Sequence, residues 1–322
     1  MIEFREAIIE ALADELARDE DVVLYGQDVA DAGGVFKSTV GLQERFGAER
    51  VIDTPISELA MTGAAFGSAL AGKRPVMEIM FGDFMALAMD SLINQAAKWP
   101  YLTNGQVTVP LTVRTAVGAG GRFGPIHSQN PGTWMQGVSG LKVVCPSTSA
   151  DAHGMLVAAI RDQDPVVFLE HKRLYATKGE APSGEPVPLG TARVVREGRD
   201  VTVVTVMKGV ADALAAAEEL AGEGIEVEVV DLRSLRPLDL PTVIASVEKT
   251  TRLVCVEEGP ATGGWAAGLA GQVAAEALYA LDDLWVITSP DTPTPFAPSL
   301  EDAWLPGSET IADVLRQRLA AA

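Results

Sequence analysis

The chain alternates between short apolar runs and longer segments in which apolar residues recur every three or four positions. Short runs of this kind are typical of strands buried on both faces, and the longer segments are typical of amphipathic helices. In the first half we expect strands at residues 22–26, 51–52, 75–80, 109–113, 141–144 and 165–169, and helices at residues 3–18, 58–71, 84–97 and 150–162. Strand–helix alternation of this kind indicates a mainly parallel sheet.

A segment at residues 176–190 interrupts this alternation. It is rich in Pro, Gly and charged residues and has no apolar period, so we interpret it as a linker. After it, we expect strands at residues 201–206, 227–232, 253–257 and 285–287, and helices at residues 210–221, 240–247, 264–281 and from 310 onward. The pattern therefore predicts an α/β protein with two open, mainly parallel α/β domains, residues 1–175 and 191–322.

The expected helix at residues 58–71 consists almost entirely of apolar and small side chains. A helix that is apolar all round is normally buried on all sides. We therefore expect this helix to pack against a second subunit.

Composition and charge narrow the range of partners. The 322 residues are 48% hydrophobic and carry a formal net charge of −19, which argues against nucleic acid or an anionic membrane as a partner. No apolar run reaches the length of a membrane span, and the first residues show no signal-peptide pattern, so we expect a cytoplasmic protein. Cys145 and Cys255 lie in strand-like runs and are expected to be buried free thiols.

Glu58 is a single acidic residue where a strand leads into the apolar helix. One interpretation is structural: Ser57 or Thr54 caps the helix, and Glu58 favours its positive N-terminal end. The other is catalytic: apolar neighbours raise the pKa of the carboxyl group, so that it can exchange a proton with a ring nitrogen. The neighbours invoked are Ile56, Leu59, Ala60, Met61, Met80 and Phe84.

The chain has three histidines. His127 lies in a long glycine-rich loop at residues 118–132, the kind of segment that carries function on a rigid scaffold, whereas His153 and His171 are expected to be structural or exposed. The sequence contains no GxGxxG fingerprint after a strand, no P-loop, no GxSxG motif and no zinc-ligand spacing. It therefore has a candidate acid and a candidate histidine but no phosphate-binding loop.

Several motifs resemble one family in the right order along nearly the whole chain. They are Asp53-Thr54-Pro55-Ile56-Ser57-Glu58, Phe81-Gly82-Asp83-Phe84, His127-Ser128-Gln129, Gly140-Leu141-Lys142-Val143-Val144, the stretch from Ile160 to Val166, Val229-Val230-Asp231-Leu232-Arg233 and Thr292-Pro293-Thr294-Pro295. The sequence resembles the β subunit of the E1 component of 2-oxoacid dehydrogenase complexes, a transketolase-like family that uses thiamine diphosphate. The resemblance implies a transketolase-like pyrimidine-binding domain followed by a transketolase C-terminal-like domain.

The resemblance also implies partners and an activity. An E1 α subunit would complete an α2β2 heterotetramer and supply the diphosphate and magnesium site, whose Gly-Asp-Gly signature is absent here, where Gly82-Asp83-Phe84 stands. The enzyme would decarboxylate a 2-oxo acid and reductively acylate the lipoyl group of the E2 acyltransferase. The C-terminal domain would contact E2.

Site residues are carried over by motif. Glu58 would hydrogen-bond the aminopyrimidine nitrogen of the cofactor, and Ile56, Met80 and Phe84 would pack against the pyrimidine ring. His127 would orient substrate and transfer protons during acylation of the lipoyl group. A structural potassium ion would be held by oxygens of Leu111, Ala159, Ile160, Asp162 and Asp164.

Two alternatives remain open at this stage. Ile126 stands where relatives usually have a polar residue, and Glu170-His171-Lys172 resembles acetoin-cleaving relatives, so the chain could be the β subunit of acetoin dehydrogenase or of another two-chain transketolase-like enzyme. From a different class, it could be a non-catalytic α/β scaffold, because the second domain has about twice as many acidic as basic side chains and would suit a basic partner.

Overall fold

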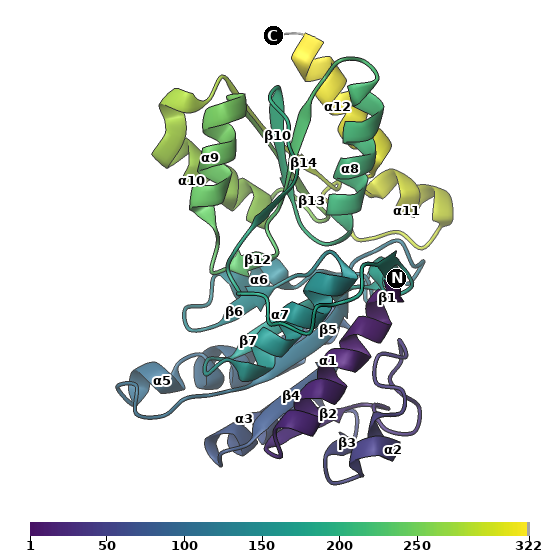
Figure 1. Cartoon of the computed structure of the whole chain (residues 1–322), viewed down its shortest axis with the longest axis vertical. Helices are drawn as coiled ribbons and strands as arrows, with labels where there is room; N and C mark the ends of the chain where they lie inside the picture. Colours follow the sequence, from purple (N-terminus) through teal and green to yellow (C-terminus); the bar gives the residue numbers. More distant parts are fainter. Residues whose placement is uncertain (321–322) are drawn as a thin grey trace. The chain divides into compact units, whose positions relative to one another are not determined.

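The computed structural model describes residues 1–320, which form two compact units (Figure 1). Unit 1 comprises residues 1–117 and 134–189, and unit 2 comprises residues 118–133 together with the chain from residue 190 onward. Both units are α/β, with a mainly parallel sheet, as the alternation of strands and helices predicts.

Unit 1 is built on parallel strands that pair in one continuous order. This order is β6 (Lys142–Val144), β7 (Val166–His171), β5 (Thr112–Val117), β4 (Arg74–Ile79), β2 (Val22–Gly26) and β3 (Val51–Asp53). The α-helices are α1 (Phe4–Arg18), α2 (Leu42–Phe46), α3 (Glu58–Leu70), α4 (Met85–Met89), α5 (Trp99–Leu102) and α7 (Ser149–Arg161). Shorter helical turns are η1 (Gly82–Phe84) and η3 (Lys172–Leu174), and η2 (Asp90–Ala96) is π-helical.

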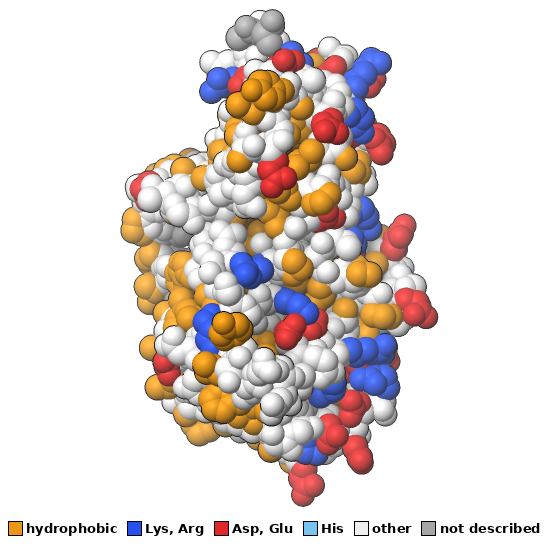
Figure 2. Space-filling view, turned by 90° about the vertical axis from the view of Figure 1, so that its left-hand side faces the viewer, with side chains coloured by type: hydrophobic (Ala, Val, Ile, Leu, Met, Phe, Trp, Pro, Cys, Tyr) orange, Lys and Arg blue, Asp and Glu red, His pale blue; other side chains and the backbone are white. Residues whose placement is uncertain are grey.

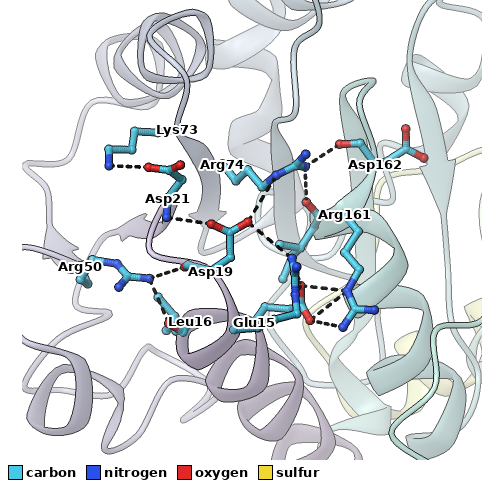
Figure 3. A network of polar contacts seen from close by, with 11 residues as sticks. Glu15, Leu16, Asp19, Asp21, Arg50, Lys73, Arg74, Arg161 and Asp162 are labelled. Carbon is cyan, nitrogen blue, oxygen red and sulfur yellow. Dashed lines mark hydrogen bonds and ion pairs between the residues drawn. The ribbon is translucent and has the colours of Figure 1, made fainter.

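Helices α1 and α7 are joined by buried charge. The Glu15 carboxylate on α1 is fully buried and accepts hydrogen bonds from Arg161 on α7, the shortest at 2.7 Å to Nη2. Beside this pair, Arg50 donates to the carbonyl oxygens of Leu16 and Asp19 at the end of α1 (Figure 3). Because carbonyls at a helix end lack partners within the helix, these contacts fix the end of α1 onto the sheet.

Unit 2 has a sheet in the order β14 (Asp283–Thr288), β13 (Arg252–Glu257), β10 (Val201–Thr205), β11 (Val227–Asp231) and β9 (Arg193–Arg196). Only β9 is antiparallel to its neighbour among these described strands. The remaining elements are α6 (Gly132–Gln136) at the boundary of the two units, β12 (Ser234–Arg236), α8 (Lys208–Ala221), α9 (Leu240–Thr250), α10 (Trp265–Ala277), η4 (Leu278–Ala280), α11 (Pro298–Trp304) and α12 (Ser308–Ala320). The core is formed by Val, Ala, Leu and Ile side chains of the sheet, α8 and α12.

Some elements differ from those expected. The strand predicted at residues 109–113 is β5, which begins at Thr112 and ends at Val117. Two short strands, β1 (Ile2–Glu3) and β8 (Lys178–Gly179), pair antiparallel, so part of the segment interpreted as a linker is bonded to the start of the chain. The loop at residues 118–133, which the sequence interpretation placed in the first domain, groups with unit 2, and its hydrogen bonds to Glu258 and Glu301 explain why. Among residues 1–320 no helix is long and apolar enough to cross a membrane.

Candidate active site

The candidate residues of unit 1 follow the carboxyl ends of three adjacent parallel strands. β2 ends at Gly26 and is followed by Gln27, β3 leads to Glu58, and β4 leads to Met80 and Phe84. Since β4, β2 and β3 are parallel neighbours in the sheet, these residues lie together along the edge of the sheet at which the strands end. In open α/β sheets this edge is where ligands bind.

Glu58 is the first residue of α3, and its side chain is only 4% exposed. Gln27, which is 3% exposed, donates a hydrogen bond from Nε2 to Glu58 Oε1 at 3.0 Å and contacts Met61 Sδ at 3.6 Å. Within the described chain, Gln27 Oε1 is buried and has no hydrogen-bond partner. A buried acceptor without a partner is costly, so this oxygen is available to a donor that the chain itself does not provide.

Both sequence-based interpretations of the surroundings of Glu58 need correction. Ser57 is at the N-cap position, but its side chain makes no capping hydrogen bond. The expected apolar pocket is also wrong in its membership: Ile56 is 81% exposed and Leu59 54% exposed, and Ala60 is exposed as well. Successive helical residues point in directions about 100° apart, so residues next to Glu58 in sequence face away from it. The partner of Glu58 is instead the polar Gln27.

Gln27 is a candidate site residue that the sequence reasoning missed. Its position directly after a buried strand that ends in glycine was the available signal. Periodicity could not reveal the contact, because 31 residues separate Gln27 from Glu58 along the chain.

Phe84 and Met80 are half-buried next to an aromatic cluster. The Phe84 ring packs edge-on against Phe81, which packs edge-on against Phe36, and Phe36 stacks on Tyr175. This chain of rings fixes the position of Phe84 beside the end of β4.

A fully buried arginine lies beneath this edge. Arg114 on β5 contacts Glu170 on β7 through Nε at 2.7 Å and Glu78 on β4 through Nη1 at 2.9 Å, and Tyr175 donates to Glu170 at 2.8 Å. Burial raises the pKa of Glu78, although the charge of Arg114 opposes the shift. Burial and the nearby charge of Glu170 also raise the pKa of Tyr175. The cluster links three central strands of unit 1.

His127 lies in unit 2, on the loop at residues 118–133, and is half-buried; its backbone N–H faces the Gly124 carbonyl at 3.4 Å. The other two histidines lie in unit 1 and are buried. His153 contacts Asp14 at 3.1 Å, and His171 accepts a hydrogen bond from the Arg173 N–H. The expectation that they are exposed is therefore wrong, and the other expectation, a structural role, agrees with their burial.

Comparison with known proteins identifies the family. The family model for the transketolase pyrimidine-binding domain matches residues 1–178, and the model for the transketolase C-terminal domain matches residues 190–311. The chain is 46% identical to the acetoin:2,6-dichlorophenolindophenol oxidoreductase β subunit of Cupriavidus necator, over 97% of this chain and 96% of that protein. It is 43% identical to the pyruvate dehydrogenase E1 β subunit of Bacillus subtilis, over 98% of this chain and 97% of that protein. The chain belongs to the transketolase-like family of dehydrogenase β subunits.

A solved structure supports the same fold. A split-gene transketolase, described as an inactive β4 tetramer, superimposes with a TM-score of 0.79 over 99% of this chain and 98% of that chain, at 23% sequence identity. At this identity the likeness concerns the fold alone.

Dependence on thiamine diphosphate is what membership of this dehydrogenase family implies, and unit 1 has groups that suit the aminopyrimidine ring of that cofactor. Glu58 offers a buried carboxyl group, Gln27 Oε1 offers an acceptor without a partner, and Phe84 offers a half-buried aromatic ring. An aminopyrimidine ring has an amino group that donates hydrogen bonds, two ring nitrogens that accept them, and an apolar face. The carboxyl group of Glu58, the free acceptor of Gln27 and the ring of Phe84 therefore suit it. Within residues 1–320 no cluster of three or more His, Cys, Asp or Glu side chains is placed to hold a metal ion.

Four of the five residues predicted to hold potassium lie in the last turn of α7 or directly after it, namely Ala159, Ile160, Asp162 and Asp164, and the fifth, Leu111, directly precedes β5. The carbonyl oxygen of Ile160 accepts a hydrogen bond from Arg74 Nη1 at 3.0 Å. The carbonyl oxygen of Asp162 accepts one from the same atom at 3.1 Å (Figure 3). The Asp162 carboxylate binds Lys142 Nζ at 2.7 Å, and that Nζ lies 3.2 Å from Asp164. The carbonyls of Leu111 and Ala159 each accept one backbone hydrogen bond. Since a carbonyl oxygen has two lone pairs, each can still bind a cation, and the potassium site stays a prediction.

Proposed function

We propose that this chain is the β subunit of a thiamine-diphosphate-dependent E1 enzyme. The enzyme cleaves the bond between the carboxyl and oxo carbons of a 2-oxo acid, releases carbon dioxide, and transfers the acyl group to one sulfur of an oxidised lipoyl disulfide on E2. The other sulfur leaves as a thiol, so the disulfide is reduced as the acyl carbon is oxidised. The observation that carries the proposal is the buried Glu58–Gln27 pair at the edge of the sheet, in a chain matched over its length by E1 β relatives.

Each site residue has a role in this proposal. Glu58 hydrogen-bonds a ring nitrogen of the aminopyrimidine and shares a proton with it, and Ile56, Met80 and Phe84 pack against the ring. The cofactor, when bound between these residues and the α subunit, would supply the nucleophile and the electron sink that decarboxylation needs. His127 orients the substrate and moves a proton during transfer of the acyl group to the lipoyl sulfur.

The α subunit completes the site in this proposal, because it holds the diphosphate and magnesium. One feature of unit 1 supports a partner chain. Helix α3 and the residues before it expose large apolar side chains: Ile56, Leu59 and Leu70. Helices α4 and α5, which follow in sequence, also expose Leu87, Tyr101 and Leu102. Figure 2 shows that hydrophobic side chains are spread over one face of the molecule. A helix that exposes several large apolar side chains in this way is typical of subunit interfaces. The E2 acyltransferase is proposed to contact unit 2.

A second candidate is the β subunit of an acetoin dehydrogenase, which uses the same cofactor. The 46% identical relative from Cupriavidus necator, named for acetoin, favours it. Ile126, beside His127, is 60% exposed and is the position at which the substrate classes are expected to differ. No observation on residues 1–320 favours the non-catalytic scaffold.

The deciding experiment is turnover by the chain co-expressed with its α subunit. Pyruvate, branched-chain 2-oxo acids and acetoin are supplied in turn, with a dye as electron acceptor and, separately, with lipoyl-bearing E2. Glu58→Ala should abolish turnover of every substrate while leaving the circular dichroism spectrum unchanged, and His127→Ala should chiefly remove acylation of the lipoyl group. Turnover by Glu58→Ala at the wild-type rate would rule out the mechanism.

Two finer points belong to the same proposal. The predicted potassium ion should raise the melting temperature in potassium chloride over that in choline chloride at equal ionic strength; equal values would rule the ion out. A cytoplasmic location is supported by Cys145 and Cys255, which are both buried free thiols, as is typical of a reducing compartment.

A further inference from the structure

The glycine-rich loop that carries His127 is held by a carboxylate from α11, at the far end of the sequence. Glu301 is fully buried and accepts hydrogen bonds from the backbone N–H groups of Gly120 at 2.9 Å and Arg122 at 3.1 Å. The Arg122 side chain donates to the same carboxylate through Nη1 at 2.8 Å. Charge-assisted hydrogen bonds in a buried setting are among the strongest in proteins.

Neighbouring contacts tie down the rest of the same stretch. Glu258, which directly follows β13, accepts a hydrogen bond from the Ala119 N–H. The Arg122 guanidinium also binds both carboxylate oxygens of Asp302, at 2.8 and 2.9 Å, and the Pro298 carbonyl at 3.0 Å. Unit 2 therefore anchors this part of the loop through both main-chain and side-chain groups.

The backbone of the loop shows that this anchoring is needed. Arg122 has φ +64°, a conformation that costs a non-glycine residue about 1–2 kcal/mol and persists only where surrounding contacts impose it. Gly124, at φ +72°, lies so close to the Phe296 ring that a Cβ there would come within 2.2 Å of it. The Gly118 N–H faces the Gln129 carbonyl at 3.5 Å, so the two ends of the loop lie together. A closed loop fixed at residues 120–124 leaves residues 125–128 little freedom.

We propose that Glu301 is a positioning residue for His127: it holds the loop at residues 118–129 in the conformation that presents the histidine for acyl transfer. This inference rests on the function proposed for His127. It adds that a residue of α11, six positions beyond the nearest motif carried over by resemblance, sets the geometry of that step.

Glu301→Gln is the informative variant, because it keeps the shape of the side chain and one acceptor oxygen but removes the charge that binds Arg122. Glu309→Gln, the same substitution at an exposed position of α12, is the matched control. In the complex with the α subunit, acylation of lipoyl-E2 by Glu301→Gln should fall about tenfold to a hundredfold, since a small misplacement of a reacting group costs that much. Dye reduction, which does not require acyl transfer to lipoyl, should fall far less.

Hydrogen exchange supplies a readout that is independent of activity. The amides of Gly120 and Arg122 should exchange about tenfold faster in Glu301→Gln than in the wild type, while amides of β10 and β13 keep their protection. Unchanged protection at residues 119–129 would overturn the proposal. If Glu301→Gln fails to fold, Arg122→Gly replaces it, because glycine tolerates the positive φ and the substitution removes the side chain that binds Glu301 while keeping the backbone N–H; a smaller effect in the same direction is then expected.

A double-mutant cycle separates positioning of His127 from general support of the fold. In the His127→Ala background, Glu301→Gln should lower acylation no further, because the group that it positions is gone. A further loss as large as in the wild-type background would show that Glu301 does not act through His127. If His127→Ala itself acylates at the wild-type rate, the proposed role of His127 fails, whereas the exchange data still decide whether Glu301 holds the loop.

Discussion

At the scale of single residues, the most informative contact joins two side chains that are polar, buried and far apart in sequence. Glu58 was identifiable from its motif, but its immediate partner, Gln27, was not. A neutral amide can donate to an ionised carboxylate and, turned over, accept from a protonated one. Gln27 is therefore suited to support Glu58 in both protonation states, as the role proposed for Glu58 requires.

Replacing Gln27 by a second carboxylate tests this pairing. In Gln27→Glu, two acids lie about 3 Å apart, and repulsion between like charges raises the pKa at which one of them ionises. We expect the acid limb of the kcat/KM profile of the complex to move up by about one pH unit or more. Gln43→Glu on α2 is the control, since Gln43 contacts the Val51 carbonyl rather than Glu58. Superimposable profiles for Gln27→Glu and the wild type would show that Gln27 does not influence Glu58.

A second residue couples stability to pH. Glu257 accepts hydrogen bonds from the N–H groups of Trp265 and Ala266 at the start of α10, yet burial raises its pKa to about 7. The folded chain thus holds this proton more tightly than the unfolded chain, whose glutamates ionise near pH 4.5. The contribution of Glu257 to the free energy of unfolding is therefore fully present below about pH 4.5 and is lost as the pH rises to about 7. Over that range the free energy of unfolding falls by up to about 1.4 kcal/mol per pH unit.

Glu257→Gln should remove that dependence. Urea unfolding at several pH values between 5 and 7 should give a flatter free energy of unfolding for the variant than for the wild type. Glu276→Gln, on the exposed face of α10, controls for the loss of one carboxylate. Parallel curves for wild type and Glu257→Gln would contradict the raised pKa.

At the scale of elements, hydrophobic periodicity predicted the alternation of strands and helices well, because buried parallel strands such as β2 and β10 are short runs rich in β-branched and apolar residues, above all Val. It misplaced β5, whose buried residues include Arg114 and Thr115. Hydropathy treats an arginine as a surface residue, and only the two glutamates on neighbouring strands make it a core residue. The partners come from β4 and β7, so no local pattern could reveal them.

The same physics explains the other misses. β1 and β8 have two residues each and are defined only by pairing with each other. The π-helical segment at Asp90–Ala96 interrupts a helix whose apolar spacing looked continuous. The loop at residues 118–133 belongs to unit 2 because Glu258 and Glu301 accept its N–H groups, and those carboxylates lie more than 130 residues away. Motif resemblance points to the candidate residues of the site, whereas long-range polar contacts determine how those residues are held.

Arg114 provides a test of how three strands of unit 1 are held together. Arg114→Met would leave Glu78 and Glu170 buried without their shared cation, and breaking a buried ion pair in this way costs about 3–5 kcal/mol. We expect urea unfolding of the variant to show a loss of that size. Lys73→Met removes an exposed ion pair with Asp21 and should change the midpoint little. Equal effects from the two substitutions would show that the buried cluster does not hold the sheet.

At the scale of the whole molecule, the described chain combines a candidate binding edge with exposed apolar side chains on α3, and its sequence has no phosphate-binding loop motif. The edge at Gln27 and Glu58 suits one ring of the cofactor. Charged diphosphate needs cations or helix N-termini, and the sequence has no motif that supplies them here. The chain should therefore bind only part of the cofactor without a partner.

Calorimetry with thiamine diphosphate and magnesium measures how much of the cofactor affinity this chain provides without the α subunit. The purified chain alone should bind at least about a hundredfold more weakly than the complex with the α subunit, a difference of about 2.7 kcal/mol. Leu59→Glu, on the exposed face of α3, should weaken assembly with the α subunit because it places a charge in the apolar interface, and cofactor affinity should return toward that of the chain alone. Leu278→Glu is the matched control: this leucine is 59% exposed, close to the 54% of Leu59, but it lies on η4 of unit 2. Tight binding by the isolated chain would contradict a shared site, and intact assembly of Leu59→Glu would place the α subunit on another face.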